Sequence, residues 1–279
     1  MKTRVKKRNS KLAEFFKHFY ILGVLLAVFF PFFIMIQLSF KDKKQVVFEF
    51  FSVLGPYHPE NYVTAFTYMK PYFINTFIMA AGTAVLSIIL ATLAGYSFGK
   101  LKFPLSKIFY GIIFSKMLLP GVMNLIPSFI LAKDLRILNS YWAVILFGAG
   151  VNMPYWVFVM TVFVKGMPTA LFESMRLDGA SELQVYRWLA IPMLKPMIAL
   201  MGMNIFLAVW NDYIWPLVTI STQELRPLSV GIAMMTTTYP QETGMLMAGY
   251  VLSSIPLLIL FIFAMRQFVE GLSAGSIKL

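Results

Sequence analysis

The residues in this chain that could carry out chemistry are few, and their spacing matches no common catalytic site. The only histidines are His18 and His58, and no HExxH pattern is present, so no histidine pair is available to bind zinc within an apolar segment. Gly95 to Lys100 reads GYSFGK, one residue short of a phosphate-binding loop and followed by Leu101 in place of Ser or Thr. Cysteine is absent, and no Ser-His-acid group or paired carboxylates stand out. The sequence therefore favours a chain that is not an enzyme, and any ATP must bind another chain.

Two charged side chains fall inside long apolar segments, where ionisable groups are costly and often functional. Lys116 lies roughly 13 Å deep at about 1.5 Å per residue, so we expect it to face a pore or a partner unless its stem extends to the interface. Asp212 is a candidate for a binding site, although it lies roughly 24 Å along its helix by the same rise, close to an interface where carboxylates are ordinary. Asn204, Asn211 and Trp215 are spaced to share one face of that helix.

The composition requires a bilayer around these residues. The chain has 279 residues, of which 59% are hydrophobic and 13% charged, with a mean hydropathy of +0.74, and so few charges cannot cover a soluble globule. A helix needs roughly 20 apolar residues to cross the hydrocarbon core, whereas barrel strands would be about half as long. We predict an all-α polytopic membrane protein with about six spans, near residues 19–40, 72–98, 108–132, 141–164, 196–220 and 243–265.

The basic residues orient these spans. Of the 24 Lys and Arg, the segments on one side of the predicted membrane carry 16, those on the other side carry seven, and Lys116 lies within a span. The positive-inside rule then places both termini and the polar segment at 168–192 in the cytoplasm. The net charge of +12 is thereby explained by topology, and we expect no nucleic-acid partner. The Lys-rich start resembles a signal peptide but lacks a small-residue cleavage site, so we interpret it as a retained first helix.

The polar segment at 168–192 carries strong local signals for a helix-turn-helix. Pro168-Thr169 can open a first short helix, and Gly179 suits a left-handed C-terminal stop. Ser181 with Gln184 forms an S-x-x-Q capping box for a second helix, which we expect Pro192 to end. Caps at both helices predict a rigid hairpin that serves as a docking surface.

Two further spans carry packing and breaking signals. Small residues recur at helical spacing in the second span, which lets a neighbouring helix approach closely; they are Ala80, Ala84, Ser87, Ala91 and Gly95. The third span contains Pro120-Gly121 and Pro127, so backbone groups are freed near its middle and must be satisfied by protein or by a wet cavity. A bent helix that lines a cavity and a simple kink are both compatible with this pattern.

Seven short stretches along the chain carry a recognisable pattern: 72–76 (YFINT), 117–121 (MLLPG), 125–127 (LIP), 138–142 (LNSYW), 178–181 (DGAS), 210–217 (WNDYIWPL) and 271–278 (GLSAGSIK). Together they resemble the permease subunits of carbohydrate ABC importers, and specifically the smaller maltose-type permease. The family's E-A-A opening appears here as Glu173-Ser174-Met175, in which Met175 enlarges a position usually held by alanine.

This resemblance implies a type I ABC importer permease fold and a set of partners. These are a second permease chain, a nucleotide-binding ATPase dimer, an extracytoplasmic solute-binding protein, a sugar substrate and membrane lipid. No cofactor is expected on this chain, since ATP and Mg belong to the ATPase. The hairpin is the implied coupling site, with Glu173, Ser174, Arg176, Asp178, Gly179, Ala180 and Ser181 as its residues, and residues 273–279 are a second possible contact.

Amides, carboxylates and aromatic faces suit sugar hydroxyls and rings. The predicted substrate path comprises Asn152, Tyr155, Asn204, Asn211, Asp212 and Trp215, although the partner permease could hold most of the sugar contacts. The predicted organisation is a basic segment 1–18, a first span 19–40, an extracytoplasmic loop 41–70, a permease core 71–267 and a cytoplasmic tail 268–279. A secondary transporter or a membrane-embedded enzyme remains the alternative; the former often shows midplane carboxylates or inverted repeats, which we do not find.

Overall fold

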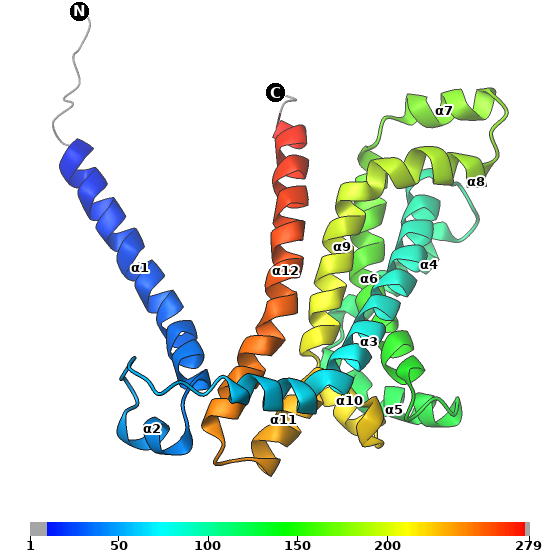
Figure 1. Ribbon diagram of the computed structural model, residues 1–279. Helices are drawn as coiled ribbons and strands as arrows, with labels where there is room; N and C mark the ends of the chain where they lie inside the picture. The colour runs from blue at the N-terminus through cyan, green and yellow to red at the C-terminus, as the bar shows by residue number, and fades with distance from the viewer. Residues whose placement is uncertain (1–9, 277–279) are drawn as a thin grey trace, which may run out of the picture. The chain divides into compact units, whose positions relative to one another are not determined.

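The computed structural model describes the backbone of residues 10–276 and the side chains of residues 13–121 and 123–262. All regular elements within this part of the chain are helices (Figure 1). The α-helices are α1 (Ser10–Ser39), α2 (Lys43–Phe48), α3 (Glu60–Lys100), α4 (Ser106–Ser115), α5 (Leu125–Asp134), α6 (Tyr141–Gly166), α7 (Thr169–Leu177), α8 (Glu182–Val185), α9 (Ile191–Asn211), α10 (Ile214–Thr219), α11 (Leu228–Thr238) and α12 (Thr243–Ser276). Short η helices lie at η1 (Lys116–Leu118), η2 (Gly121–Asn124), η3 (Tyr186–Ala190) and η4 (Gln223–Leu225).

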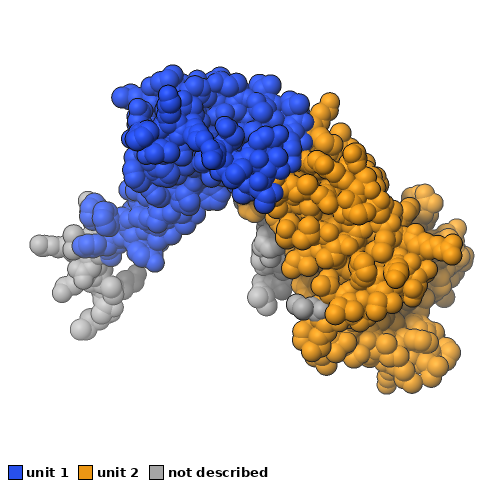
Figure 2. All heavy atoms as spheres, turned by 90° about the horizontal axis from the view of Figure 1, so that it is seen from below, with its two compact units in different colours: residues 1–68, 235–253 blue, residues 69–234, 254–279 orange. Residues whose placement is uncertain are grey.

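The chain divides into two compact units, coloured separately in Figure 2. Unit 1 comprises residues 1–68 and 235–253, and unit 2 comprises residues 69–234 and 254–279. The predicted basic segment 1–18 lies partly outside the described residues. The predicted tail 268–279 lies wholly outside the residues whose side chains are described.

Five helices in the described part are long and apolar enough to cross a membrane: 13–39, 60–100, 141–166, 182–211 and 243–262. The prediction of an all-α polytopic protein is thereby confirmed. The predicted third span is not one helix, because α4 and α5 have ten residues each and are separated by η1 and η2. Pro120 and Gly121 explain the break, since proline removes a backbone donor and forces Leu119 into the extended conformation that is observed.

The core of unit 2 is formed by α6, α9 and the part of α3 from Met69 onward. The predicted small-residue stripe of α3 is confirmed: Ala80 and Ser87 are fully buried, and Ala84 and Ala91 nearly so. At Gly95, an added Cβ would lie 2.5 Å from the Cβ of Met160 and 3.0 Å from its carbonyl carbon. This glycine therefore sets how closely α3 approaches α6, as expected where lipid offers no hydrophobic drive for helix association.

Two asparagines tie the loops at one end of this bundle. The Nδ2 of Asn75 donates to the carbonyls of Glu224 and Arg226, at 2.7 and 2.9 Å, and its Oδ1 accepts from the Tyr141 hydroxyl. Asn139 adopts a left-handed conformation, which asparagine tolerates, and its Oδ1 accepts from the backbone N–H groups of Ser221 and Thr222. Both residues belong to the motifs 72–76 and 138–142, and their contacts give those motifs a structural role.

Candidate functional site

The predicted hairpin is present at one end of unit 2, where Figure 1 shows α7 and α8 lying across the ends of α3, α6 and α9. Its first helix ends in a complete Schellman motif: the N–H of Gly179 donates to the carbonyl of Arg176, and that of Ala180 to the carbonyl of Met175. Gly179 has φ +83°, so the predicted left-handed stop is confirmed. Met175 and Ala180, at the two ends of this motif, both pack against the hydrophobic core, so the enlarged Met175 side chain has an apolar environment.

The second helix of the hairpin begins as predicted but does not end as predicted. Ser181 and Gln184 form the capping box, with Gln184 Oε1 accepting from the N–H of Ser181 at 2.7 Å. The prediction that Pro192 ends this helix is wrong, because α8 passes through the π turn η3 into α9, where Pro192 occupies the first turn. The π turn, with the N–H of Ile191 donating to the Tyr186 carbonyl, lets the chain continue although Pro192 lacks an N–H and crowds the preceding turn.

One carboxylate, Glu182, joins the two arms of the hairpin to the membrane bundle. Its Oε1 accepts from Arg176 Nε at 2.7 Å, and its Oε2 accepts from the hydroxyl of Tyr96 on α3 at 2.6 Å. The Glu182 carboxylate also raises the pKa of the Arg176 guanidinium above its ordinary value. Phe172, on the first helix of the hairpin, is fully buried, and the ammonium of Lys100 on α3 lies 4.7 Å from the centroid of its ring. The hairpin is thus fixed to the end of α3 by polar and apolar contacts together.

The other face of the hairpin is open. Leu177 and Leu183 flank the Gly179 turn with 88% and 70% of their surface exposed. Most of the predicted coupling residues are exposed with them, namely Glu173, Ser174, Asp178, Gly179 and Ser181, whereas Arg176 and Ala180 are half-buried. Glu173 and Arg176 also line one groove together with Glu182 and Lys100. The structure therefore gathers the predicted coupling residues on one small element that presents apolar and acidic side chains.

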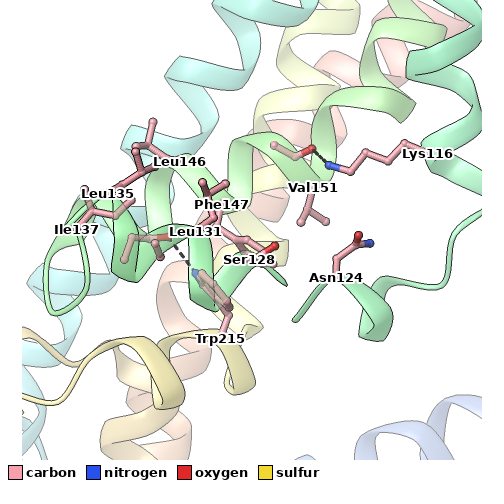
Figure 3. Close-up of a pocket in the computed structure, with 13 residues that line it drawn as sticks. Lys116, Asn124, Ser128, Leu131, Leu135, Ile137, Leu146, Phe147, Val151 and Trp215 are labelled. Carbon is pink, nitrogen blue, oxygen red and sulfur yellow. Dashed lines mark hydrogen bonds between the residues drawn. The ribbon is translucent and has the colours of Figure 1, made fainter. Parts of the chain in front are cut away.

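A second candidate site is a cavity of about 210 Å³ in unit 2, shown in Figure 3. Lys116, Asn124 and Ser128 supply polar groups from the broken third segment, and α6 supplies Phe147 and Gly150. The ammonium of Lys116 donates to the Gly150 carbonyl at 2.9 Å, which couples the break to the middle of α6. Of the two interpretations left open by the sequence, the structure favours the one in which the interrupted segment lines a cavity over a simple kink.

The predicted substrate-path residues do not converge on this cavity, and among them only Trp215 lines it. The predicted helical face joining Asn204, Asn211 and Trp215 is wrong, because α9 ends at Asn211 and Trp215 lies on α10. The indole of Trp215 is 2% exposed, donates Nε1–H to the Ala143 carbonyl at 2.9 Å and stacks on Phe147 at 3.7 Å. Trp215 is therefore a wall of the cavity rather than a free stacking platform.

Three of the remaining path residues have hydrogen-bond partners within a few positions in the chain, namely Asn152, Asn211 and Asp212. Asp212 Oδ1 accepts from the N–H of Trp215 at 3.3 Å, and its backbone carbonyl accepts from Ser229. The amides of Asn152 and Asn211 donate to carbonyls four residues earlier in their own helices. Asn204 and Tyr155 are exposed on α9 and α6. Asn124 and Ser128, which face the cavity, were not among the predicted residues; the nearby Pro120-Gly121 and Pro127 are the sequence signal that could have indicated them.

Comparison with known proteins decides the family. The model for the binding-protein-dependent transport system inner membrane component matches residues 87–273, which include both the hairpin and the cavity. The chain belongs to this permease family. Its membership agrees with the absence of catalytic constellations in the sequence, since the family consists of transport subunits.

Several relatives of this permease are named as sugar-transport subunits. The arabinooligosaccharides transport system permease protein AraQ of Halalkalibacterium halodurans is 30% identical over 78% of this chain and 79% of its own length. The melibiose/raffinose/stachyose import permease protein MelC of Bacillus subtilis is 26% identical over 91% of this chain and 93% of its own. Among solved structures, a chain of a bacterial ABC transporter involved in alginate import matches with a TM-score of 0.81 at 20% identity, covering 95% of this permease and 99% of that chain. The fold predicted from the motifs is thereby confirmed.

Proposed function

We propose that this permease is one half of the membrane passage of an ATP-driven importer for a disaccharide or oligosaccharide. The family match carries the proposal, and the names of relatives narrow the cargo: arabinooligosaccharides, melibiose and raffinose, maltodextrin and lactose are all saccharides of two or more units. No relative or solved structure named here supports a secondary transporter or a membrane-embedded enzyme.

The coupling role falls to the hairpin between residues 168 and 192. Its exposed Leu177 and Leu183 provide apolar anchors, and Glu173 and Asp178 provide charge, on an element whose backbone is fixed by caps at both helices. Such a surface suits a cleft in a separate ATPase that holds ATP and Mg, with both termini of the permease on that cytoplasmic side. Shifting the ratio of two conformations of the passage from 1:99 to 99:1 requires roughly 5.5 kcal/mol of differential binding. A rigid hairpin can transmit that free energy to the membrane helices, whereas a flexible loop would move without displacing them.

The cargo would pass between this permease and a second permease chain, delivered by an extracytoplasmic solute-binding protein. A related solved structure contains an alginate pentasaccharide-bound periplasmic protein, which supports this partner class. Lys116, Asn124 and Ser128 join Asn152, Tyr155, Asn204, Asn211, Asp212 and Trp215 as the residues to test along the passage.

The test of the coupling role is a charge placed on the exposed face. We expect Leu177→Glu and Leu183→Glu together to abolish ATP-dependent uptake and co-purification of the ATPase, because both side chains would be desolvated at the interface. Leu105→Glu is the matched control, since Leu105 is likewise an exposed leucine, at 61%, but lies outside the hairpin. ATPase binding and sugar uptake that survive the double substitution would contradict the role of the hairpin.

The cargo class is tested with the assembled complex reconstituted in vesicles and supplied with labelled di- and oligosaccharides. Uptake is compared with ATP present inside the vesicles, outside them, or absent. We expect uptake that depends on ATP and on the solute-binding protein. Uptake that proceeds without any ATPase chain would favour a secondary transporter, and turnover of a saccharide by the isolated permease would favour an enzyme.

A further inference from the structure

Unit 1 exposes a concentrated apolar surface directly after α1. We name it the 47–57 surface, and its exposed large apolar side chains are Val47, Phe48, Phe50, Phe51, Val53, Leu54 and Tyr57. Phe48 and Leu54 are 83% and 75% exposed, so their apolar surface is almost wholly uncovered within the permease. Isolated exposed apolar residues are ordinary, but a contiguous group of this size marks a contact with a partner or a membrane.

Hydrogen bonds hold this surface against the last turns of α1. Gln37 Nε2 donates to the carbonyls of Phe50, at 3.1 Å, and Ser52, while the backbone N–H of His58 donates to the carbonyl of Phe40 at 2.8 Å. Lys41, only 4% exposed, directs its ammonium at the carbonyls of Glu49 and Phe50, at the C-terminal end of α2. A cation at this helix end satisfies carbonyls that have no partner within the helix. The 47–57 surface therefore cannot move far from the end of α1.

The position of α1 then fixes the depth of the 47–57 surface. Residues 13–39 form a 27-residue candidate span whose most apolar 18-residue window has no buried residue. Within the span, Leu38 and Ser39 are buried, at the end that holds the 47–57 surface. At about 1.5 Å per residue this helix is about 40 Å long, against a hydrocarbon core of about 30 Å, so its end at Ser39 reaches the headgroup region. Tilting the helix changes the overhang but still leaves its end at the interface. An apolar surface bonded to that end lies at the same level.

Charge and cavity shape match a lipid leaflet. Lys44 is exposed on α2 beside Phe48, and the neighbouring Lys43 is also exposed while its ammonium donates to Gln241 Oε1. Basic and aromatic side chains together are typical of interfacial segments, where the cations face lipid phosphates. An apolar cavity of about 180 Å³ lies between α1 and this segment, lined mainly by Phe33, Ile36, Phe40, Val53, Leu54 and Tyr57. Its lining is suited to part of an acyl chain.

We propose that the 47–57 surface is inserted into the lipid leaflet at the C-terminal end of α1 and anchors that end of the helix at a fixed depth. The occupant is the bilayer, with acyl chains against the phenylalanines and headgroups against the lysines. This inference requires that α1 crosses the membrane, and it requires neither a particular cargo nor the ATPase.

Single-cysteine spin labelling tests the anchor, because the chain has no cysteine of its own. Labels at Phe48, Phe51 and Leu54 replace exposed side chains, so substitution removes little packing. The assembled transporter is reconstituted in phosphatidylcholine and phosphatidylglycerol vesicles, and nitroxide collision rates are measured with oxygen and with a neutral nickel chelate. Lys44 provides the matched control on the polar side of the same segment, and the unsubstituted complex gives the background.

We expect collisions with oxygen to exceed those with nickel at the three apolar positions, by severalfold relative to the ratio at Lys44. Nickel collisions that dominate at all positions would show that the surface faces water and would overturn the anchor. Labels shielded from both reagents would instead assign the surface to the partner permease. Shielding that appears only when the solute-binding protein is added would assign it to that protein. Retained sugar uptake by each cysteine variant establishes that the result describes a folded transporter.

Discussion

The bond between Tyr96 and Glu182 should decide how firmly the hairpin is held to α3. Replacing Glu182 by alanine removes the acceptor of a 2.6 Å hydrogen bond and leaves the hydroxyl of Tyr96, a residue only 3% exposed, without that partner. An unpaired buried polar group costs about 1–3 kcal/mol. The same substitution removes the ion pair between Glu182 and Arg176. The Arg176 side chain is 33% exposed and the Glu182 side chain 48%, and an exposed pair of this kind contributes only about 0.2–1 kcal/mol.

The magnitudes predict an order among variants. Glu182→Ala should destabilise the docked hairpin by about 2 kcal/mol, a factor of roughly 30 in its local opening equilibrium. Glu182→Gln retains an acceptor for Tyr96, and Tyr96→Phe leaves Glu182 bonded to Arg176 and to solvent, so each should cost below about 1 kcal/mol. The double variant Glu182→Ala with Tyr96→Phe should cost less than the sum, because no hydroxyl is left unpaired.

Hydrogen exchange of the α8 backbone amides measures this opening directly in the reconstituted transporter, and ATP-driven uptake measures its consequence. Ser97→Ala is the control, since the Ser97 hydroxyl lies next to Tyr96 in α3 and donates to the Leu93 carbonyl within the same helix. If Glu182→Gln accelerated exchange as strongly as Glu182→Ala, charge rather than the hydrogen bond to Tyr96 would dominate, and the reasoning would be refuted.

Three further pairs of substitutions test other parts of the permease. Gly179 has a left-handed backbone, and a Cβ added there would meet nothing within 4 Å. Asparagine tolerates this conformation, so Gly179→Asn should retain coupled uptake. In Gly179→Val the left-handed backbone costs roughly 1–2 kcal/mol or more, and most of the coupled uptake should be lost. Gly95→Ala should lower the thermal stability of the complex by about 1–3 kcal/mol through the clash with Met160, whereas Gly150→Ala, with open space around the new Cβ, should not. Trp215→Phe should destabilise the folded permease by about 1–3 kcal/mol, because the buried Ala143 carbonyl loses its indole donor. Trp142→Phe, at a 59% exposed position, should leave the stability unchanged when both variants are compared by thermal unfolding.

The hairpin could be predicted almost completely from the sequence because its signals are local. Capping boxes and left-handed glycine stops involve residues within a few positions of one another, so Ser181, Gln184 and Gly179 suffice to place the turn. The fate of Pro192 could not be predicted the same way. Proline usually ends a helix, but a π turn one turn earlier relieves the clash, and no local residue preference announces that alternative.

The cavity was harder to predict because its residues come from segments far apart in the chain. The sequence indicated a break at Pro120 and a role for Lys116, but not that Ser128 and Trp215 would meet across it. The end of α9 at Asn211 carries no proline or glycine. It is stabilised by a bond from Ser229, 17 residues away, to the Asp212 carbonyl, and such tertiary contacts override the helical spacing that joined Asn211 to Trp215.

The continuity of α8 with α9 has a mechanical consequence for coupling. A π turn could act as a soft hinge that absorbs motion of the hairpin, but Val185, Ala190 and Leu194 along this junction are all fully buried and pack in the core. Close-packed interiors deform little, so a displacement of the hairpin must carry the start of α9 with it. α9 in turn packs on α6, whose Gly150 carbonyl holds Lys116 at the cavity. A movement imposed at the Gly179 turn therefore has a contiguous, well-packed route to the broken third segment, and Ala190→Leu, which overpacks that junction, should impair uptake without weakening ATPase binding.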